Sequence, residues 1–209
     1  MTGRSVPKLS LLLWDVGGVL LSNGWDHLSR AAAVDRFHLN AAEFEARHAA
    51  VEAAFETGSL SEDGYLDATV FYEPRTFSRD EFRTFIRSRS TAHPSAIEVA
   101  RALQRGGRYH LATLNNESRE LNEYRIQKFG LAEIFEEFFS SCYTGHRKPD
   151  PAAYRVALDI TRRAPEETLF LDDRPENVAA AESLGIRSLR VIDPGRLRGD
   201  LDRLGVVAN

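Results

Sequence analysis

Residues 11–20 read LLLWDVGGVL, and this stretch decides the fold. Its first four residues, Leu11–Trp14, form a continuous apolar run, which is typical of a strand buried on both faces of a parallel sheet. The run ends at Asp15, and Gly17 and Gly18 follow close behind it. The stretch therefore predicts a buried strand whose carboxyl end presents a carboxylate.

Four later runs are similar to this strand, and helical segments lie between most of them. Together the predicted strands are Leu11–Trp14, Tyr109–Leu114, Glu137–Ser140, Thr168–Leu171 and Ser188–Ile192. Asp150 is the predicted N-cap of a helix that begins at Pro151, Gly130 ends an earlier helix, and Pro175 begins a later one. This alternation predicts the α/β class, with a parallel sheet covered by helices on both faces.

The distance between the first and second predicted strands is far longer than a crossover needs. A parallel crossover takes a dozen or so residues. The excess reads as helices alone, because apolar residues recur at helical spacing there, as from Phe44 to Phe55. We expect residues 1–21 and 93–209 to form the sheet domain, and residues 22–92 to form a small all-helical domain inserted after the first strand.

The composition is that of an ordinary globular protein. Of 209 residues, 43% are hydrophobic and 28% are charged, and the formal net charge is -4. This balance argues against disorder and against nucleic acid as a partner. No apolar stretch approaches the roughly 18 residues of a membrane span, and Asp15 makes the run after Arg4 and Lys8 too short for a signal peptide. With Cys142 as the single cysteine, the sequence favours a cytoplasmic protein.

Polar side chains follow several of the predicted strands, at the edge where parallel sheets bind ligands. They are Asp15, Asn115, Asn116, Lys148, Asp172 and Asp173. Three carboxylates close together repel one another unless a cation neutralises them. Mg²⁺ prefers oxygen ligands and leaves room for water and a substrate phosphate. Carboxylates, a divalent cation and a lysine together predict a phosphoryl-transfer site, in which a carboxylate attacks phosphorus.

Four segments in chain order carry a resemblance to a known family. They read LLLWDVGGVL (residues 11–20), LATLNN (111–116), RKPDP (147–151) and FLDDRPEN (170–177). The sequence resembles the haloacid dehalogenase-like (HAD) hydrolases, with a helical cap inserted after the first motif. Residues 55–61, FETGSLS, also resemble a cap segment of the subgroup with sugar-phosphate phosphatases and the phosphatase domain of epoxide hydrolases. The resemblance implies a Rossmann-like core, phosphatase activity and Mg²⁺ as the cofactor.

The resemblance also implies roles for individual residues. Asp15 would be the nucleophile that forms an aspartyl-phosphate, and Lys148 would pair with it and with the phosphate. Asp173 would ligate Mg²⁺ directly, together with Asp15 and the backbone carbonyl of Gly17. Asp172 would ligate the ion directly or through water, or would orient Lys148. The residues expected to contact the substrate are Gly17, Gly18, Asn115 and Asn116.

Two positions depart from the pattern of the family. Gly17 stands where its phosphatases usually carry a second Asp as general acid and base, and Asn115 stands where Ser or Thr normally binds phosphate. General acid–base catalysis is worth about 10²–10⁴-fold in rate, so we expect esters with poor leaving groups to react slowly. His27 and His146 are the candidates to replace the missing acid.

We therefore expect a Mg²⁺-dependent hydrolase of small phosphorylated metabolites. Two alternatives stay open: a 2-haloacid dehalogenase, whose Asp attacks carbon without a metal, and a binding protein that keeps the fold but has lost turnover. The Asp172–Asp173 pair favours the phosphatase, because dehalogenases do not keep it. The sequence indicates neither the substrate nor the oligomeric state, and a homodimer stays open.

Overall fold

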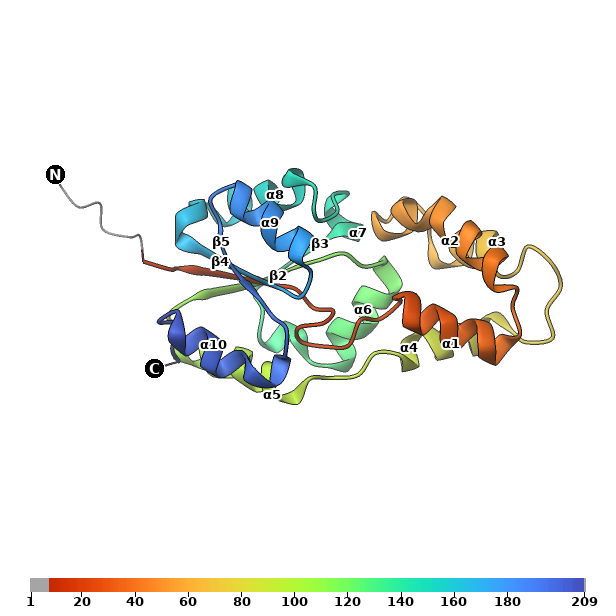
Figure 1. Cartoon of the computed structure of the whole chain (residues 1–209), viewed down its shortest axis with the longest axis horizontal. Helices are drawn as coiled ribbons and strands as arrows, with labels where there is room; N and C mark the ends of the chain where they lie inside the picture. Colours follow the sequence, from red (N-terminus) through yellow and green to blue (C-terminus); the bar gives the residue numbers. More distant parts are fainter. Residues whose placement is uncertain (1–7, 209) are drawn as a thin grey trace.

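The computed structural model describes residues 8–208, in which five parallel strands form one sheet between layers of helices (Figure 1). In spatial order the strands are β3 (Glu137–Ser140), β2 (His110–Asn115), β1 (Leu11–Trp14), β4 (Thr168–Asp172) and β5 (Arg187–Arg190). The predicted α/β fold is confirmed. Residues 1–7, which the predicted sheet domain includes, lie outside the described residues, as does Asn209.

Two groups of helices accompany the sheet. The first follows β1 directly and comprises α1 (His27–Phe37), α2 (Ala41–Glu56), α3 (Glu62–Thr69) and α4 (Arg79–Ser88). We call this group, with its loops, the helical insert. The second comprises α5 (Pro94–Gly106), α6 (Arg119–Lys128), α7 (Ser141–Thr144), α8 (Pro151–Thr161), α9 (Pro175–Ser183) and α10 (Leu197–Arg203), with 3₁₀ turns η1 (Leu131–Glu133), η2 (Pro165–Glu167) and η3 (Pro194–Arg196). Among the described residues, no helix combines the length and the apolar character that a membrane crossing requires.

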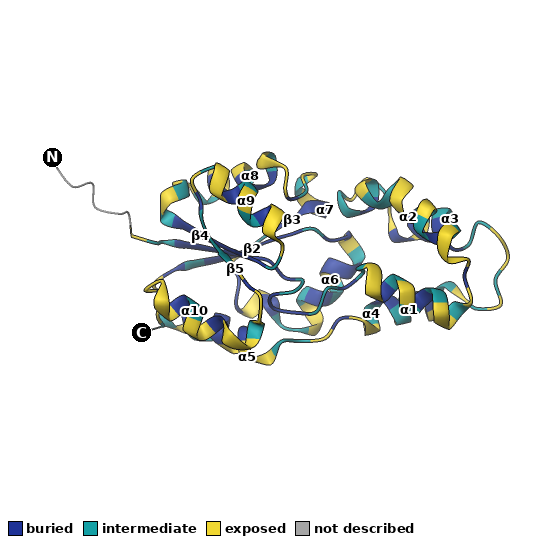
Figure 2. Cartoon of the chain, in the orientation of Figure 1, coloured by how far each residue is buried: buried dark blue, intermediate teal, exposed yellow. Residues whose placement is uncertain are grey.

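Alternating side chains of β1 pack on opposite faces of the sheet, as strand geometry requires. Leu11 and Leu13 lie in one apolar cluster with residues of α8 and α9. Leu12 and Trp14 lie in another, with residues of α5 and α10. Figure 2 shows the strands buried between helices whose outer sides are exposed. Because β1 is buried on both faces, it reads as a continuous apolar run rather than an alternating one.

Most of the predicted helix ends are confirmed. Asp150 Oδ1 accepts a hydrogen bond from the backbone of Ala152 at 2.8 Å and so caps α8, which begins at Pro151. Gly130 follows α6 with a φ of 63°, the left-handed conformation that favours glycine. Pro175 is the first residue of α9. These helix ends could be predicted because each depends on the conformational preference or capping ability of a single residue.

Three strands differ from their predicted bounds. β2 spans His110–Asn115 rather than Tyr109–Leu114, and β4 ends at Asp172 rather than Leu171. The largest difference is in β5. β5 spans Arg187–Arg190, not Ser188–Ile192. Its pairing with β4 runs from Leu169–Arg187 to Asp172–Arg190, and β4 itself ends at Asp172. Ile192 lies past the pairing and is 82% exposed. The apolar run therefore predicts an end of β5 that is two residues too late, because the strand can pair only as far as the neighbouring β4 extends.

The helical insert has an apolar cluster of its own, to which α2, α3 and α4 contribute Phe44, Leu66 and Phe82. Figure 1 shows the insert beyond the carboxyl end of β1. The two chain segments that join it to the sheet domain are hydrogen-bonded to each other, for example from Ser22 N to Thr91 O at 2.8 Å. The insert is all-helical, as expected, and the domain boundaries near residues 22 and 92 stay a prediction.

Candidate active site

Asp15 lies immediately after the central strand. Its backbone N–H donates to Leu171 O at 2.8 Å, which continues the pairing of β1 with β4. Its Oδ1 accepts from Val16 N at 2.7 Å, and the residue is only 7% exposed. The chain runs from β1 to β2 on one side and reaches β4 on the other. Asp15 therefore stands at the switch point where open parallel sheets bind ligands.

Lys148 connects the carboxyl ends of β1 and β4. Its Nζ lies 2.9 Å from Asp15 Oδ1 and 2.6 Å from Asp172 Oδ2. Two hydrogen bonds with Asn116 hold its backbone: Asn116 Nδ2 donates to Lys148 O, and Lys148 N donates to Asn116 Oδ1, each at 2.8 Å. The ammonium group thus sits between two carboxylates, and the Asn116 amide from the β2 end fixes the loop that carries it.

Burial and charge act in opposite directions on this pair. Burial lowers the pKa of Lys148, but the charges of Asp15 and Asp172 raise it by more, so the lysine stays cationic. Burial raises the pKa of Asp15, the Lys148 charge opposes this, and the nearby charges of Asp172 and Asp173 add to the rise. The lysine alone therefore does not compensate the buried negative charge at this edge.

Asp172 and Asp173 complete the acidic cluster. Asp172 is fully buried and accepts hydrogen bonds from Asn177 Nδ2 at 3.1 Å and from Arg174 N at 2.8 Å. Asp173 is partly buried, and its Oδ2 accepts from Asn23 Nδ2 at 3.4 Å. Asp173 Oδ1 is buried without a hydrogen-bond partner. Burial and the charge of Asp172 raise the pKa of Asp173.

These three aspartates are suited to hold a divalent cation. One carboxylate oxygen from each of Asp15, Asp172 and Asp173 lies within 4.8 Å of the other two. All donors are oxygen atoms, which matches the preference of Mg²⁺. The unpaired Asp173 Oδ1 also needs a positive or hydrogen-bonding partner. The donor set and the unmet charge therefore fit Mg²⁺.

The two glycines after Asp15 allow close approach to this cluster. Gly18 has a φ of 71°, and a β-carbon there would overlap the side chain of Asp173. At Gly17, an added β-carbon would lie 2.8 Å from Asn23 Oδ1. Asn23 thus occupies the space beside Gly17, and a side chain at position 17 would have to displace it.

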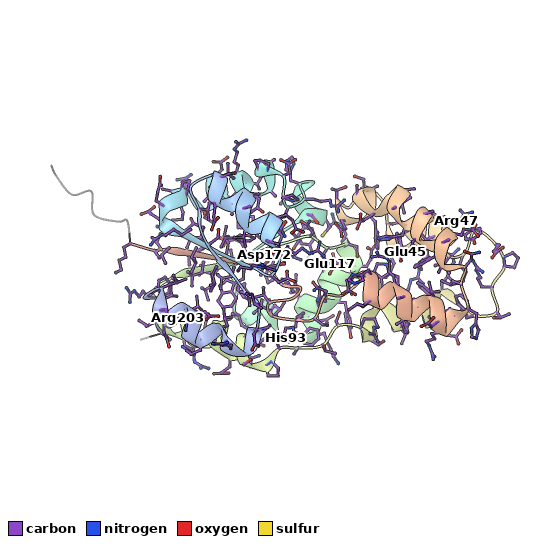
Figure 3. All side chains as sticks on the ribbon, viewed as in Figure 1. Glu45, Arg47, His93, Glu117, Asp172 and Arg203 are labelled. Atoms are coloured by element: carbon purple, nitrogen blue, oxygen red, sulfur yellow. The ribbon has the colours of Figure 1, made fainter. Side chains whose placement is uncertain are left out.

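A cavity of about 370 Å³ opens over Asp15 and Lys148, between the sheet edge and the helical insert. Its wall is mostly polar. The charged lining residues are Asp15, Asp26, Arg30, Glu52, Glu56, Glu117, Arg125, Arg147, Lys148, Arg174 and Glu176. In the view of Figure 3, Glu117 lies between Asp172 and the helices of the insert. A small polar molecule therefore fits this space better than an apolar one.

The structure brings most of the predicted site residues together. Gly17 and Asn116 line the cavity with Asp15 and Lys148, and Gly18 lies against Asp173. Asn115 is different: its amide donates to Asn122 Oδ1 at 3.1 Å and accepts from Ser140 Oγ at 2.9 Å. Its side chain is committed to this buried network and does not line the cavity. The Asn115 side chain points away from the cavity because its amide is hydrogen-bonded to residues of β3 and α6.

The two candidate acids are also separated. His27 lines the cavity as an exposed residue at the start of α1, whereas His146 is exposed and is not part of the cavity wall. Sequence reasoning assigned no site role to Glu56, Glu117 or Arg147, which do line it. Arg147 and Glu117 each adjoin a motif residue, Lys148 and Asn116 respectively, which was a usable signal. Glu56 lies in the quoted cap segment, and nothing in that segment says which way its side chain points.

Comparison with known proteins gives one family match. The family model described as haloacid dehalogenase-like hydrolase matches residues 9–185. Flavin mononucleotide hydrolase 1 of Arabidopsis thaliana is 28% identical over 168 residues, which are 78% of this chain and 65% of that protein. Two longer curated relatives are matched over 33% and 24% of their lengths. The chain thus spans less than two thirds of the length of these relatives.

Solved structures share the fold. A HAD family enzyme of Bacteroides thetaiotaomicron superposes with a TM-score of 0.76 at 20% identity, covering 88% of this chain and 94% of that one. The same enzyme was solved in complex with magnesium and inorganic phosphate. The L-2-haloacid dehalogenase of Xanthobacter autotrophicus superposes with a TM-score of 0.61 at 18% identity, covering 95% of this chain and 84% of that one.

Proposed function

Because the chain belongs to the haloacid dehalogenase-like hydrolase family, we propose that it is a Mg²⁺-dependent phosphatase that acts on small phosphate esters. The resemblance in the four motifs is confirmed by the family match. One observation carries the proposal: Asp15 lies 2.9 Å from Lys148 and within 4.8 Å of carboxylate oxygens of Asp172 and Asp173, at the floor of a polar cavity. This arrangement supports the proposed roles of Asp15 as the nucleophile, of Lys148 as the cation for phosphate, and of the three aspartates as metal ligands.

The proposed reaction has two steps. An Asp15 carboxylate oxygen forms a bond to phosphorus as the bond to the ester oxygen breaks, which leaves an aspartyl-phosphate and an alkoxide that takes up a proton to become the alcohol. Water then attacks the same phosphorus, releases inorganic phosphate and restores the carboxylate. Lys148 offsets negative charge on Asp15 and on the phosphoryl oxygens in both steps.

Asp15, Asp172 and Asp173 are the residues that would hold Mg²⁺, together with the Gly17 carbonyl that the family pattern implies. The ion, when bound, neutralises phosphoryl oxygens and lowers their repulsion toward the aspartate nucleophile. Two similar proteins support this cofactor and substrate class. One is named as a flavin mononucleotide hydrolase, and the other was solved with magnesium and phosphate.

The acidic cluster also favours a phosphatase over the alternative of a dehalogenase. Displacement of halide from carbon by an aspartate needs no divalent cation. In a dehalogenase the repulsion among three carboxylates, which Lys148 does not fully offset, would destabilise the fold without serving the reaction. In a phosphatase the same charges bind the ion that the reaction requires.

Phosphate release from a panel of alkyl and aryl phosphates tests this proposal. We expect activity with Mg²⁺, its loss in excess EDTA, and a loss of at least about 10³-fold in Asp15→Asn. Asp150→Asn is the matched control, because Asp150 caps α8 outside the cavity and Asn caps helices equally well. Phosphate release that persists in Asp15→Asn, or halide release from 2-haloacids that survives EDTA, would contradict the proposal.

A further inference from the structure

Glu56 belongs to the part of the cavity wall that the helical insert supplies. It is the last residue of α2, and α2 lies beyond the sheet edge that carries Asp15 (Figure 1). Glu56 and Asp15 line the same cavity. One carboxyl group therefore comes from the sheet and the other from the insert that faces it.

Contacts with the sheet domain hold the end of α2. Ser141 Oγ, at the start of α7, donates to the backbone O of Glu56 at 2.6 Å. Gly58, with a φ of 74°, lies so close to Cys142 O that a β-carbon would not fit. Arg147 Nε forms an ion pair with Glu56 Oε2 at 2.7 Å. Both the backbone and the side chain of Glu56 are thus placed by the sheet domain as well as by the insert.

We propose that Glu56 is the general acid and base of this hydrolase and replaces the aspartate that is absent at Gly17. The inference rests on the proposed function. In phosphoryl transfer the attacking and leaving oxygens lie roughly in line with phosphorus. A leaving group on a phosphate held at Asp15 therefore points away from the sheet edge, toward the insert. The wall that needs a proton donor is the wall that carries Glu56.

Both steps balance with Glu56 in this role. In the first, the Glu56 carboxyl gives its proton to the ester oxygen as the P–O bond breaks and the bond from Asp15 to phosphorus forms. In the second, the Glu56 carboxylate takes a proton from the water whose oxygen attacks phosphorus. Asp15 leaves as a carboxylate with inorganic phosphate, and Glu56 is protonated again for the next turnover.

The surroundings of Glu56 suit a group that both donates and accepts a proton. Burial raises its pKa, and although Arg147 lowers it, Glu117 and Glu52 raise it further. Arg174 has a smaller lowering effect, and the pKa lies at about 7. Near neutral pH the acid and the carboxylate are then present in comparable amounts, which is optimal for general acid–base catalysis.

The two histidines considered from the sequence fit this role less well. His146 is exposed and lies outside the cavity wall, so it does not reach a bound ester. His27 lines the cavity, but it is exposed at the first position of α1. Glu56, by contrast, has only 24% of its side chain exposed. Because Glu56 is more enclosed than His27, water competes less with the substrate for hydrogen bonds to its carboxyl group.

Glu56→Gln tests the proposal through the dependence of kcat/KM on the leaving group. This parameter reports the steps up to departure of the alcohol. We expect kcat/KM for an alkyl phosphate to fall by about 10²–10⁴-fold, and that for p-nitrophenyl phosphate by less than tenfold, because nitrophenolate leaves without a proton. In the wild type, kcat/KM for the alkyl ester falls as pH rises above about 7, where Glu56 loses its proton, and Glu56→Gln abolishes this fall.

The aryl ester shows that the variant is folded, and Glu52→Gln is the matched control. Glu52 lies one turn earlier on α2, also lines the cavity and lies 3.7 Å from Arg147. Because the charge of Glu52 raises the pKa of Glu56, its loss should move the fall in kcat/KM for the alkyl ester to lower pH. Below that fall, where Glu56 is protonated, the loss of Glu52 should affect both esters alike. Equal effects of Glu56→Gln on the two esters, or an unchanged pH profile, would overturn the role of Glu56. Phosphate release that is absent in the wild type, or retained in Asp15→Asn, would instead overturn the proposed function itself.

Discussion

Asn23 fills the space beside Gly17 that a second aspartate would need. Its Oδ1 lies 2.8 Å from the position of a β-carbon at residue 17, and its Nδ2 donates to Asp173 Oδ2 at 3.4 Å. An amide can hold Asp173 in place but cannot transfer a proton at neutral pH. Beside Gly17, therefore, the chain carries an amide that orients the Asp173 carboxylate, where an aspartate at position 17 would have supplied an acid.

The first prediction restores an aspartate at this position in the Glu56→Gln background. Gly17→Asp alone must displace Asn23, whereas Gly17→Asp with Asn23→Ala has the room. We expect the version with Asn23→Ala to raise kcat/KM for an alkyl phosphate by at least about tenfold over Glu56→Gln. The version that keeps Asn23 should gain less. If Asn23→Ala gives no advantage, crowding does not limit the restored aspartate.

At the scale of elements, the end of α2 is one of the points where the insert contacts the sheet domain. Ser141 Oγ and Cys142 O, from α7, lie against Glu56 and Gly58 respectively. The Arg147–Glu56 ion pair adds a third link from the loop before α8. A change in this short segment should therefore affect both stability and the placement of Glu56.

Gly58→Ala is the second prediction. The positive φ of 74° disfavours alanine, and its β-carbon would collide with Cys142 O. We expect a loss of about 2–3 kcal/mol in the free energy of unfolding, measured by urea titration, together with slower turnover of alkyl phosphates. Gly107→Ala is the matched control, because Gly107 has a φ of 62° but open space at its β-carbon. It should lose only about 1–2 kcal/mol and keep its activity; equal losses in the two variants would exclude a contribution from the Cys142 contact.

At the scale of the whole molecule, two apolar bodies meet at a polar cavity. The sheet packs its clusters on α5 and α10 and on α8 and α9, and the insert packs around its own aromatic residues. Leu121 of α6 belongs to the cluster of the insert, so the separation of the two bodies is not complete. Charged side chains are concentrated in the cavity between the two bodies. An ion bound there would stabilise the folded state of the whole chain.

The third prediction concerns this coupling of ion binding to stability. A ligand that binds only the folded state at ten times its Kd adds about 1.4 kcal/mol to the free energy of unfolding. For a chain of this size this corresponds to a rise of about 3–6 °C in Tm. We expect Mg²⁺ to produce such a rise in the wild type, measured by calorimetry, and to produce little in Asp173→Asn. A rise of the same size in the variant would place the ion elsewhere.

Much of the fold was predictable because its signals are local. Buried parallel strands read as apolar runs, and the ends of α8 and α6 depend on Asp150 and Gly130 themselves. The end of β5 was not predictable, because it depends on where β4 stops. Within the site, Asp15, Lys148 and the Asp172–Asp173 pair were identified from the motifs, and the structure brings them together. The direction of the Asn115 side chain was not readable, because Asn122 and Ser140 determine it.

By itself, the sequence determined the sheet, the helical insert and the family, since burial patterns, helix caps and motif order act over short distances along the chain. Only the tertiary structure decided which charged groups share the cavity. Glu56 and Asp15 lie far apart in the sequence, and they line one cavity because Ser141, Cys142 and Arg147 tie the end of α2 to the sheet domain. Contacts between distant segments set the direction of a side chain and the degree of its burial, and these set its pKa.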